Sequence, residues 1–271
     1  MTPSIIIAVA PNGARKTKQD HLAIPLTAKE LGETAKSCLE AGASMIHLHV
    51  RDKYQKHSIS VDLYREAIEQ IRFQTDNSIY IQVTSESVRR YSPNEQFEMI
   101  HSLKPPAVSI GLREIRRESE AKISQHFIMM RANKVYPQVI LYNNYDISMY
   151  KDWLQRGVLP GSAYPVLLVI GKQQKEGAFE VEDLNQTLIN DLPYKSWMTC
   201  GFGYQEFEVA QRTIQMNGNI RLGFENNDLL ENKQVATDNA DLIFQSNEYI
   251  NNEGYSSASF LETLEKMKPD W

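Results

Sequence analysis

The sequence predicts a (β/α)8 barrel, in which eight parallel strands, each followed by a helix, close into a cylinder. Eight short apolar segments alternate along the chain with longer segments of helical period, and no linker or charge block separates them. The length of 271 residues is close to the ~250 residues typical of such a barrel. We therefore predict a single barrel domain over residues 1–271.

The predicted strands are rich in β-branched residues and apolar throughout, which is typical of a parallel sheet buried on both faces. An open doubly wound sheet is the alternative, but the segment after the first strand lacks the glycine pattern of a dinucleotide-binding fold. Eight strand–helix units favour closure into a barrel. In chain order the predicted strands are 4–10, 44–50, 78–84, 107–111, 138–143, 164–170, 196–201 and 219–225.

Two of the intervening helices have clear start signals. Thr27-x-x-Glu30 is a capping box before an Ala/Leu-rich run, and Ser92-Pro93-x-Glu95 adds proline at the first helical position. Such signals between apolar strands support the alternation of strands and helices that the barrel requires.

The composition excludes several other classes of protein. Lys and Arg number 29 against 34 Asp and Glu, a net charge of −5, so we expect no nucleic-acid partner and no polybasic membrane surface. The two cysteines, Cys38 and Cys200, are too few for a disulfide framework and favour a reducing compartment. The apolar run 5–10 is too short for the core of a signal peptide or for a membrane span. We expect a cytoplasmic protein.

Two histidines, His47 and His49, lie at the end of the second predicted strand. Residues two apart on a strand point to the same face, so both imidazoles project into the mouth of the predicted barrel. This geometry suits a metal chelate, although an H-x-H pair also arises by chance on a half-buried strand.

Glu225, at the end of the eighth predicted strand, adds a carboxylate. Strands two and eight both flank strand one, so Glu225 can approach His47 and His49. Two neutral imidazoles and one carboxylate leave coordination positions open, as a catalytic Zn2+ requires. The alternative for Glu225 is an ion pair with Arg51 or Arg221.

Other polar residues fall at the same rim. Arg221 faces inward, where a guanidinium either pairs with Asp52 or binds a substrate carboxylate or negative charge developing in the reaction. Thr84 and Ser85 follow the third strand, where their hydroxyls bind either substrate or the local backbone. The basic loop 11–21 follows the first strand and is either a solvated loop or an anion-binding lid.

Three further histidines are not placed as metal ligands. His57 falls in a polar connection, and His101 and His126 fall in predicted helices. Because the average charge of the chain is acidic, anionic ligands must be received by the basic residues of the rim, which are Arg15, Lys16, Lys18 and Arg221.

These motifs resemble those of the β-keto acid cleavage enzymes. The similarity extends over nearly the whole chain and is most specific in segments 40–52 (EAGASMIHLHVRD) and 221–227 (RLGFENN), with 10–14 (APNGA) in addition. The resemblance implies a (β/α)8 barrel that forms a homo-oligomer, a dimer or a tetramer. It also implies a Zn2+ ion held by His47, His49 and Glu225.

The activity that the resemblance implies is a reaction between a β-keto acid and acetyl-CoA that yields acetoacetate and a new acyl-CoA. The metal supplies Lewis-acid polarisation of the keto acid. Arg221 matches the active-site arginine of the family, and Thr84 matches a substrate-binding serine.

Two positions depart from the family pattern. Arg15 stands where the enzyme for an amino-substituted substrate has an acidic residue that meets an ammonium group. An arginine repels that cation, so the resemblance implies a neutral or anionic substrate tail. Asn226 replaces an aspartate with a proposed catalytic role. Because asparagine takes no proton, either another group is the general base or Asn226 only orients Arg221 and the substrate.

Three other functions remain open on the residues alone. A metal-dependent hydrolase of the amidohydrolase kind also combines a barrel with H-x-H, but it needs histidines at strands five and six, which 138–143 and 164–170 lack. A mononuclear iron oxygenase also accepts two histidines and a carboxylate. The third is a barrel that binds a metal and senses a ligand without catalysis.

Overall fold

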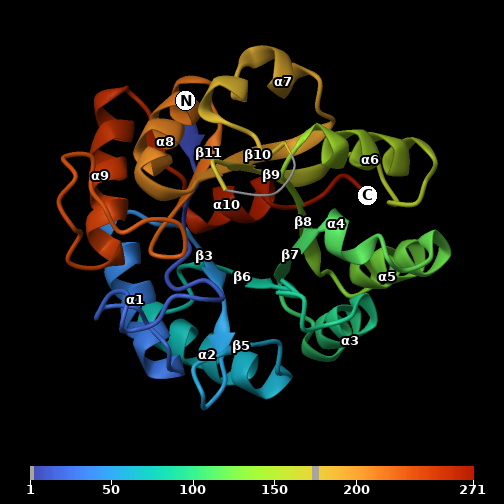
Figure 1. The fold of residues 1–271 in the computed structure, drawn as a ribbon, viewed down its shortest axis with the longest axis horizontal. Coiled ribbons are helices and arrows are strands. Elements are labelled where there is room, and N and C mark those ends of the chain that lie inside the picture. Colours follow the sequence, from blue (N-terminus) through green and yellow to red (C-terminus); the bar gives the residue numbers. More distant parts are fainter. Residues whose placement is uncertain (1–2, 173–176) are drawn as a thin grey trace.

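Eight parallel strands close into a barrel in the computed structural model, which describes residues 3–172 and 177–271 (Figure 1). The barrel strands are β2 (Ile7–Val9), β3 (Met45–Leu48), β6 (Tyr80–Thr84), β7 (Ala107–Gly111), β8 (Tyr136–Leu141), β9 (Tyr164–Ile170), β10 (Tyr194–Gly201) and β11 (Asn219–Leu222). Their order around the barrel is β10-β11-β2-β3-β6-β7-β8-β9. The predicted (β/α)8 barrel is thereby confirmed.

The helices surround the strands (Figure 1). They are α1 (Ala28–Ala41), α2 (Val61–Thr75), α3 (Pro93–Leu103), α4 (Leu112–Ile115), α5 (Glu120–Ala132), α6 (Asn144–Gln155), α7 (Gln186–Asn190), α8 (Glu206–Gln215), α9 (Asn239–Asn252) and α10 (Phe260–Lys266), with 3-10 turns at Val181–Asp183 and Gly203–Gln205. Both predicted capping boxes, at Thr27 and at Ser92, are present. Among the described residues, no helix is long and apolar enough to span a membrane.

The inside of the barrel is layered from one end to the other. On β6, Tyr80, Gln82 and Thr84 alternate inward, because residues two apart on a strand share a face. Tyr80 packs against Phe260 of α10, with 6.4 Å between the ring centroids, so α10 covers the amino-terminal end. Gln82 is buried above it, and Thr84 lines a pocket at the carboxyl-terminal end. Polar side chains therefore collect at the end where barrel enzymes have their sites.

The first predicted strand is divided in the structure. β1 (Ser4–Ile5) pairs with β12 (Ser256–Ser257) in a separate sheet, and only β2 enters the barrel. Between them, the Ile6 N–H donates to the Asn219 side-chain oxygen at 2.8 Å. A side-chain acceptor thus replaces a ladder bond, and the strand prediction over 4–10 was wrong in its continuity.

The eighth predicted strand ends at Leu222, three residues earlier than expected. Gly223 has φ +132°, and a Cβ there would lie 2.5 Å from the Ala10 carbonyl oxygen. The chain then turns, and the Asn226 N–H donates to the Gly223 carbonyl at 2.8 Å. Glu225 therefore lies on a turn beyond the strand. The extent of the barrel domain to residues 1 and 271 stays a prediction.

Candidate metal centre

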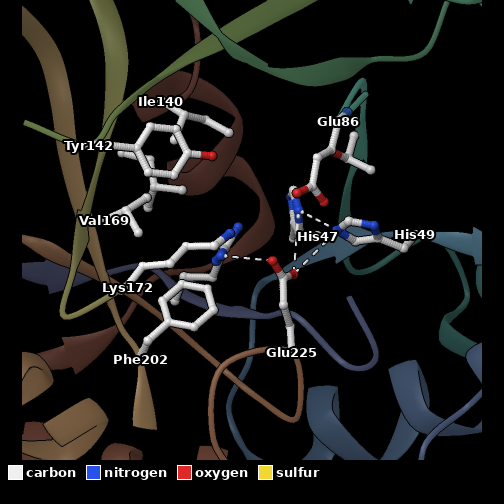
Figure 2. Close-up of a pocket in the computed structure, with 12 residues that line it drawn as sticks. His47, His49, Glu86, Ile140, Tyr142, Val169, Lys172, Phe202 and Glu225 are labelled. Carbon is white, nitrogen blue, oxygen red and sulfur yellow. Dashed lines mark hydrogen bonds and ion pairs between the residues drawn. The ribbon is translucent and has the colours of Figure 1, made fainter. Parts of the chain in front are cut away.

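His47, His49 and Glu225 meet at the carboxyl-terminal end of the barrel, with their nitrogen and oxygen atoms within 4.8 Å of one another (Figure 2). The two Nε2 atoms are 3.2 Å apart, and Glu225 Oε2 lies 3.7 Å from His47 Nε2 and 3.4 Å from His49 Nε2. Glu225 Oε2 is buried and receives no hydrogen bond from the described residues. An unpaired buried carboxylate oxygen is costly unless a cation compensates it.

The protonation states of these groups suit a metal ion. Burial and the neighbouring Arg221 lower the pKa of His47 to about 3, so its imidazole is neutral at pH 7. Burial opposes ionisation of Glu225, but Arg221 and His49 beside it hold its pKa well below the ordinary value. Neutral imidazole and ionised carboxylate are the forms that bind a metal ion.

The hydrogen-bond partners of the two histidines fix their tautomers. His47 Nδ1 lies 2.8 Å from Gln82 Oε1, so Nδ1 carries the proton. His57 Nε2 lies 2.8 Å from the Glu86 carbonyl, which only accepts, so the proton of a neutral His57 is on Nε2. His57 Nδ1 then accepts from His49 Nδ1, 3.4 Å away. Both ligand histidines therefore direct unprotonated Nε2 atoms at each other, an arrangement that a cation between them stabilises.

His57 is thus placed differently from the expectation of a polar connection. It lies in β5 (His57–Ser58), paired with β4 (Val50–Arg51), and is buried against His49. Burial and His49 lower its pKa to about 3. His57 is not in the group of candidate ligands, but it contacts the candidate ligand His49 directly. His101 and His126, 2.8 Å apart on α3 and α5, are outside that group.

Replacing His57 with Phe is expected to weaken zinc binding by roughly 10–100-fold, because the Nδ1–H of His49 loses its acceptor. The affinity is measured by competition with a chromogenic chelator. Tyr91→Phe is the matched control, since the Tyr91 ring packs on His57 without entering the chain of imidazole hydrogen bonds. Equal zinc affinity in His57→Phe and the wild type would refute the orienting role of His57.

The loop after β2 packs closely against the Glu225 side chain. Arg51 donates to the carbonyl oxygens of Asn12, Gly13 and Lys16 at 2.7–3.1 Å, so it holds this loop and forms no ion pair with Glu225. Gly13 has φ +57°, and a Cβ there would lie 2.6 Å from Glu225 Cγ. Only glycine allows this approach of the loop to the carboxylate side chain.

Gly13→Ala is therefore expected to displace Glu225. The displaced carboxylate should weaken zinc binding by at least ~10-fold, because a candidate ligand that is no longer oriented binds the ion less well. Gly157→Ala is a control for backbone strain alone, because Gly157 has φ +72° with nothing within 4 Å of its Cβ position. Zinc content and melting temperature are measured for both. An effect of the same size in the two variants would assign the loss to strain rather than to contact with Glu225.

Arg221 lies beside the three candidate ligands on β11. Its guanidinium donates to Glu225 Oε1 and to Asn226 Oδ1, each at 3.3 Å, and contacts Cys200 Sγ at 3.3 Å. Of the two ion-pair partners considered for Glu225, Arg221 is thus the one that the fold provides. Asn226 contacts Arg221 rather than the space between the ligands.

A buried carboxylate that the sequence analysis missed stands behind Asn226. Glu206, the first residue of α8, accepts from Asn226 Nδ2 at 3.2 Å, from the Gly223 N–H at 3.1 Å and from Asn227 Nδ2 at 3.4 Å. Burial raises its pKa to about 8, and the three N–H donors oppose a further rise.

The pocket above the ligands has walls of mixed character (Figure 2). The Lys172 ammonium lies over the rings of Phe202 and Tyr142, 4.7 and 5.7 Å from their centroids. Glu86 directs its carboxylate into the pocket from the side of His47, across from Lys172. The remaining lining residues are His49, Thr84, Ile140, Leu167, Val169, Arg221 and Glu225.

Of the other residues predicted to bind substrate, Thr84 lines the pocket, whereas Ser85 and Arg15 do not. Ser85 is buried and donates to the Ser109 carbonyl at 2.9 Å, so its hydroxyl bonds the backbone of the neighbouring strand β7 rather than the local backbone. Arg15 is exposed and is not among the lining residues. In the same loop, Lys18 pairs with Glu30 at 2.9 Å.

Comparisons with known proteins identify the family of the chain. A family model described as beta-keto acid cleavage enzyme matches residues 4–268. The 3-keto-5-aminohexanoate cleavage enzyme of Fusobacterium nucleatum is 26% identical over 248 residues, 90% of each chain. The 3-oxoadipate:acetyl-CoA acetyltransferase of Cupriavidus necator is 26% identical over 257 residues, 90% of this chain and 88% of the relative. The structure of ObcA in a ternary complex with a C4-CoA adduct and oxalate has a TM-score of 0.73 at 13% identity, over 90% of this chain and 67% of ObcA, which is a likeness of fold.

Proposed function

The chain belongs to the beta-keto acid cleavage enzyme family, and on that premise we propose that it is a Zn2+-dependent enzyme that converts a β-keto acid and acetyl-CoA into acetoacetate and a new acyl-CoA. The observation that carries the proposal is the buried group of His47, His49 and Glu225 at the base of a polar pocket. The name of the Cupriavidus relative supports acetyl-CoA as the co-substrate. A homo-oligomer and a cytoplasmic location remain predictions.

His47, His49 and Glu225 would hold the Zn2+ ion, which would supply Lewis-acid polarisation of the substrate's keto group. Arg221 adds a fixed positive charge beside the ligands, where it binds a carboxylate or the negative charge of an enolate. Thr84 presents its side chain to the same pocket.

Glu86 is the group that we assign as the general base. The pocket is lined by two carboxylates, Glu86 and Glu225, and Glu225 is committed to the metal. Asn226, the position where the family pattern has an aspartate, takes no proton. Glu86 is anchored through its backbone, whose N–H donates to Thr84 Oγ1 at 3.1 Å and whose carbonyl accepts from His57 Nε2 at 2.8 Å, while its side chain lines the pocket.

Glu86 takes a proton from the carbon between the keto and carboxyl groups, and the resulting enolate carbon attacks the acetyl thioester, which expels CoA thiolate. The thiolate then attacks the original keto carbon, and cleavage of its bond to the central carbon gives the new acyl-CoA and the enolate of acetoacetate. Glu86 returns the proton to that enolate.

The substrate tail is proposed to be neutral or anionic. In the sequence analysis this preference is assigned to Arg15, but Arg15 does not line the pocket, whereas Lys172 lines it together with Arg221. Lys172→Glu is expected to lower kcat/KM for a dicarboxylic β-keto acid such as 3-oxoadipate by roughly 10–100-fold, because an attraction becomes a repulsion in a poorly solvated site.

Steady-state rates with 3-oxoadipate and with 3-keto-5-aminohexanoate measure this preference. Arg15→Glu is the matched charge reversal outside the pocket, and we expect it to change the ratio of the two kcat/KM values by less than about threefold. If Arg15→Glu changes the ratio of the two kcat/KM values more than Lys172→Glu does, substrate preference is set by Arg15 in the loop after β2 and not by Lys172.

The reaction itself is tested by metal analysis of the purified protein and by incubation with acetyl-CoA and a panel of β-keto acids while acetoacetate is measured. We expect zinc at one ion per chain and acetoacetate from a substrate with a neutral or anionic tail. Iron in place of zinc would favour an oxygenase. Zinc-loaded protein that forms no acetoacetate from any substrate would leave a hydrolase or a metal-binding barrel without catalysis.

A further inference from the structure

Glu206 is a buried acid outside the pocket, and its side-chain hydrogen bonds go to one short segment, residues 223–227. Its two oxygens accept from the Gly223 backbone and from the side chains of Asn226 and Asn227, at 3.1–3.4 Å. Its side chain contacts neither a lysine nor an arginine within ion-pair distance among the described residues. Glu225 lies on this turn between Gly223 and Asn226, and both of these residues donate to the Glu206 carboxylate. Glu206 therefore holds the turn on either side of Glu225.

The contact with Arg221 decides how the Asn226 amide is oriented. A guanidinium only donates, so Asn226 must present Oδ1 to Arg221, which lies 3.3 Å away. Asn226 Nδ2 is then left on the other side, where it donates to Glu206 at 3.2 Å. The amide therefore lies between a carboxyl group and a cation, with each end facing the group that it suits.

Arg221 depends on this arrangement because it has few other partners. It is buried, its Nε has no hydrogen-bond partner in the described part of the protein, and one terminal nitrogen makes the contacts to Glu225, Asn226 and Cys200. Loss of the Asn226 contact leaves the guanidinium held chiefly by the carboxylate that is also a metal ligand. Such a group is free to turn away from the pocket.

We propose that Glu206 is a positioning residue for the proposed reaction: through the Asn226 amide it holds the Arg221 guanidinium towards the substrate, and through the 223–227 turn it holds Glu225. The inference rests on the proposed function, since Arg221 is the group that binds the β-keto acid there. Glu206 itself does not line the pocket and does not touch the substrate.

An exchange of side chains tests the relay. Glu206→Gln removes the charge and places an amide against an amide. Asn226→Asp places two acids 3.2 Å apart, where only one of them ionises readily. The double variant Glu206→Gln/Asn226→Asp restores one acid and one amide in contact, with the acid now directly against Arg221. The net charge and the number of side-chain atoms stay those of the wild type.

The variants are prepared as zinc-loaded full-length proteins and assayed above the pKa of about 8 that burial gives Glu206, so that the wild type carries the carboxylate. Zinc content, melting temperature, kcat, KM and the calorimetric affinity for acetoacetate are measured. Glu208→Gln is the matched control, since Glu208 lies on the same helix but is exposed and pairs with Arg212 at 2.9 Å.

Each single variant is expected to lose roughly 10–100-fold in kcat/KM and to bind acetoacetate more weakly, with zinc still bound. The double variant should exceed the product of the two single effects by at least ~10-fold. Rescue in the double variant supports the proposal even if Glu206→Gln folds poorly. Glu206→Gln activity within about twofold of the wild type, or a double variant without rescue, overturns it.

The proposed function fails in a different way. A zinc-loaded wild type that neither forms nor binds acetoacetate overturns the proposed function and the role of Glu206 together. A wild type that is active, with Glu206→Gln equally active, overturns only the role of Glu206.

Discussion

His47→Ala should remove zinc and turnover together. The imidazole is one of three candidate ligands, and the two that remain, His49 and Glu225, leave a site with too few donors to retain the ion against dilution. We expect zinc to fall from one ion per chain to near zero and acetoacetate formation to fall by at least ~100-fold. Elemental analysis and the coupled rate of acetoacetate formation measure the two effects on the same sample.

The control for this variant is a histidine on the outer layer. His101 lies on α3, where it contacts His126 at 2.8 Å, so His101→Ala changes a similar pair of rings without touching the pocket. It should keep both zinc and activity. Activity that survives in His47→Ala after zinc is lost would show that the reaction does not depend on this metal site.

The barrel could be predicted because its signal is local and repeated. A parallel strand buried on both faces is apolar throughout, and segments of helical period separate the strands, two of them with clear start signals. The errors came from non-local contacts. The Asn219 side chain interrupts the first strand, and the approach of Ala10 to Gly223 ends the last one. Neither contact has a pattern within its own segment.

The grouping of the three candidate ligands was predictable for a geometric reason. His47 and His49 share a face by strand period, and barrel closure brings the turn after β11 beside β3 across β2. Lys172 and Glu86 carried a weaker signal, since each is a charged residue just beyond the end of a barrel strand. His57 reaches the site through a short antiparallel pair that no local pattern predicts.

The position of Glu206 at the start of a helix favours an explanation other than contact with the site. An acid at the start of a helix is ordinarily explained by the positive end of the helix dipole and by solvent. Here the residue is buried, because the 223–227 turn covers it and supplies three N–H donors. Sequence reasoning therefore identified Asn226 as an unusual residue at its position without finding the acid in contact with it.

Glu86→Gln should abolish turnover while leaving the metal site intact. The amide is nearly the same shape as the carboxylate but takes no proton, so removal of the substrate's central proton loses its base. The expected loss in kcat is roughly 10²–10⁴-fold, the usual contribution of a positioned general base. Zinc content should not change, because Glu86 is not in the ligand group. KM should change little, since the carboxylate acts on the reacting carbon and not on the substrate's charged ends.

Proton removal can be observed apart from the rest of the reaction. In heavy water without acetyl-CoA, the wild type is expected to accelerate exchange of the central protons of a β-keto acid, followed by nuclear magnetic resonance. Glu86→Gln should exchange these protons no faster than zinc-loaded wild-type protein whose pocket is blocked by an inhibitor. Glu86→Asp should retain part of the rate, because it keeps a carboxylate on a shorter side chain. If Glu86→Gln exchanges as fast as the wild type, the base is a different group.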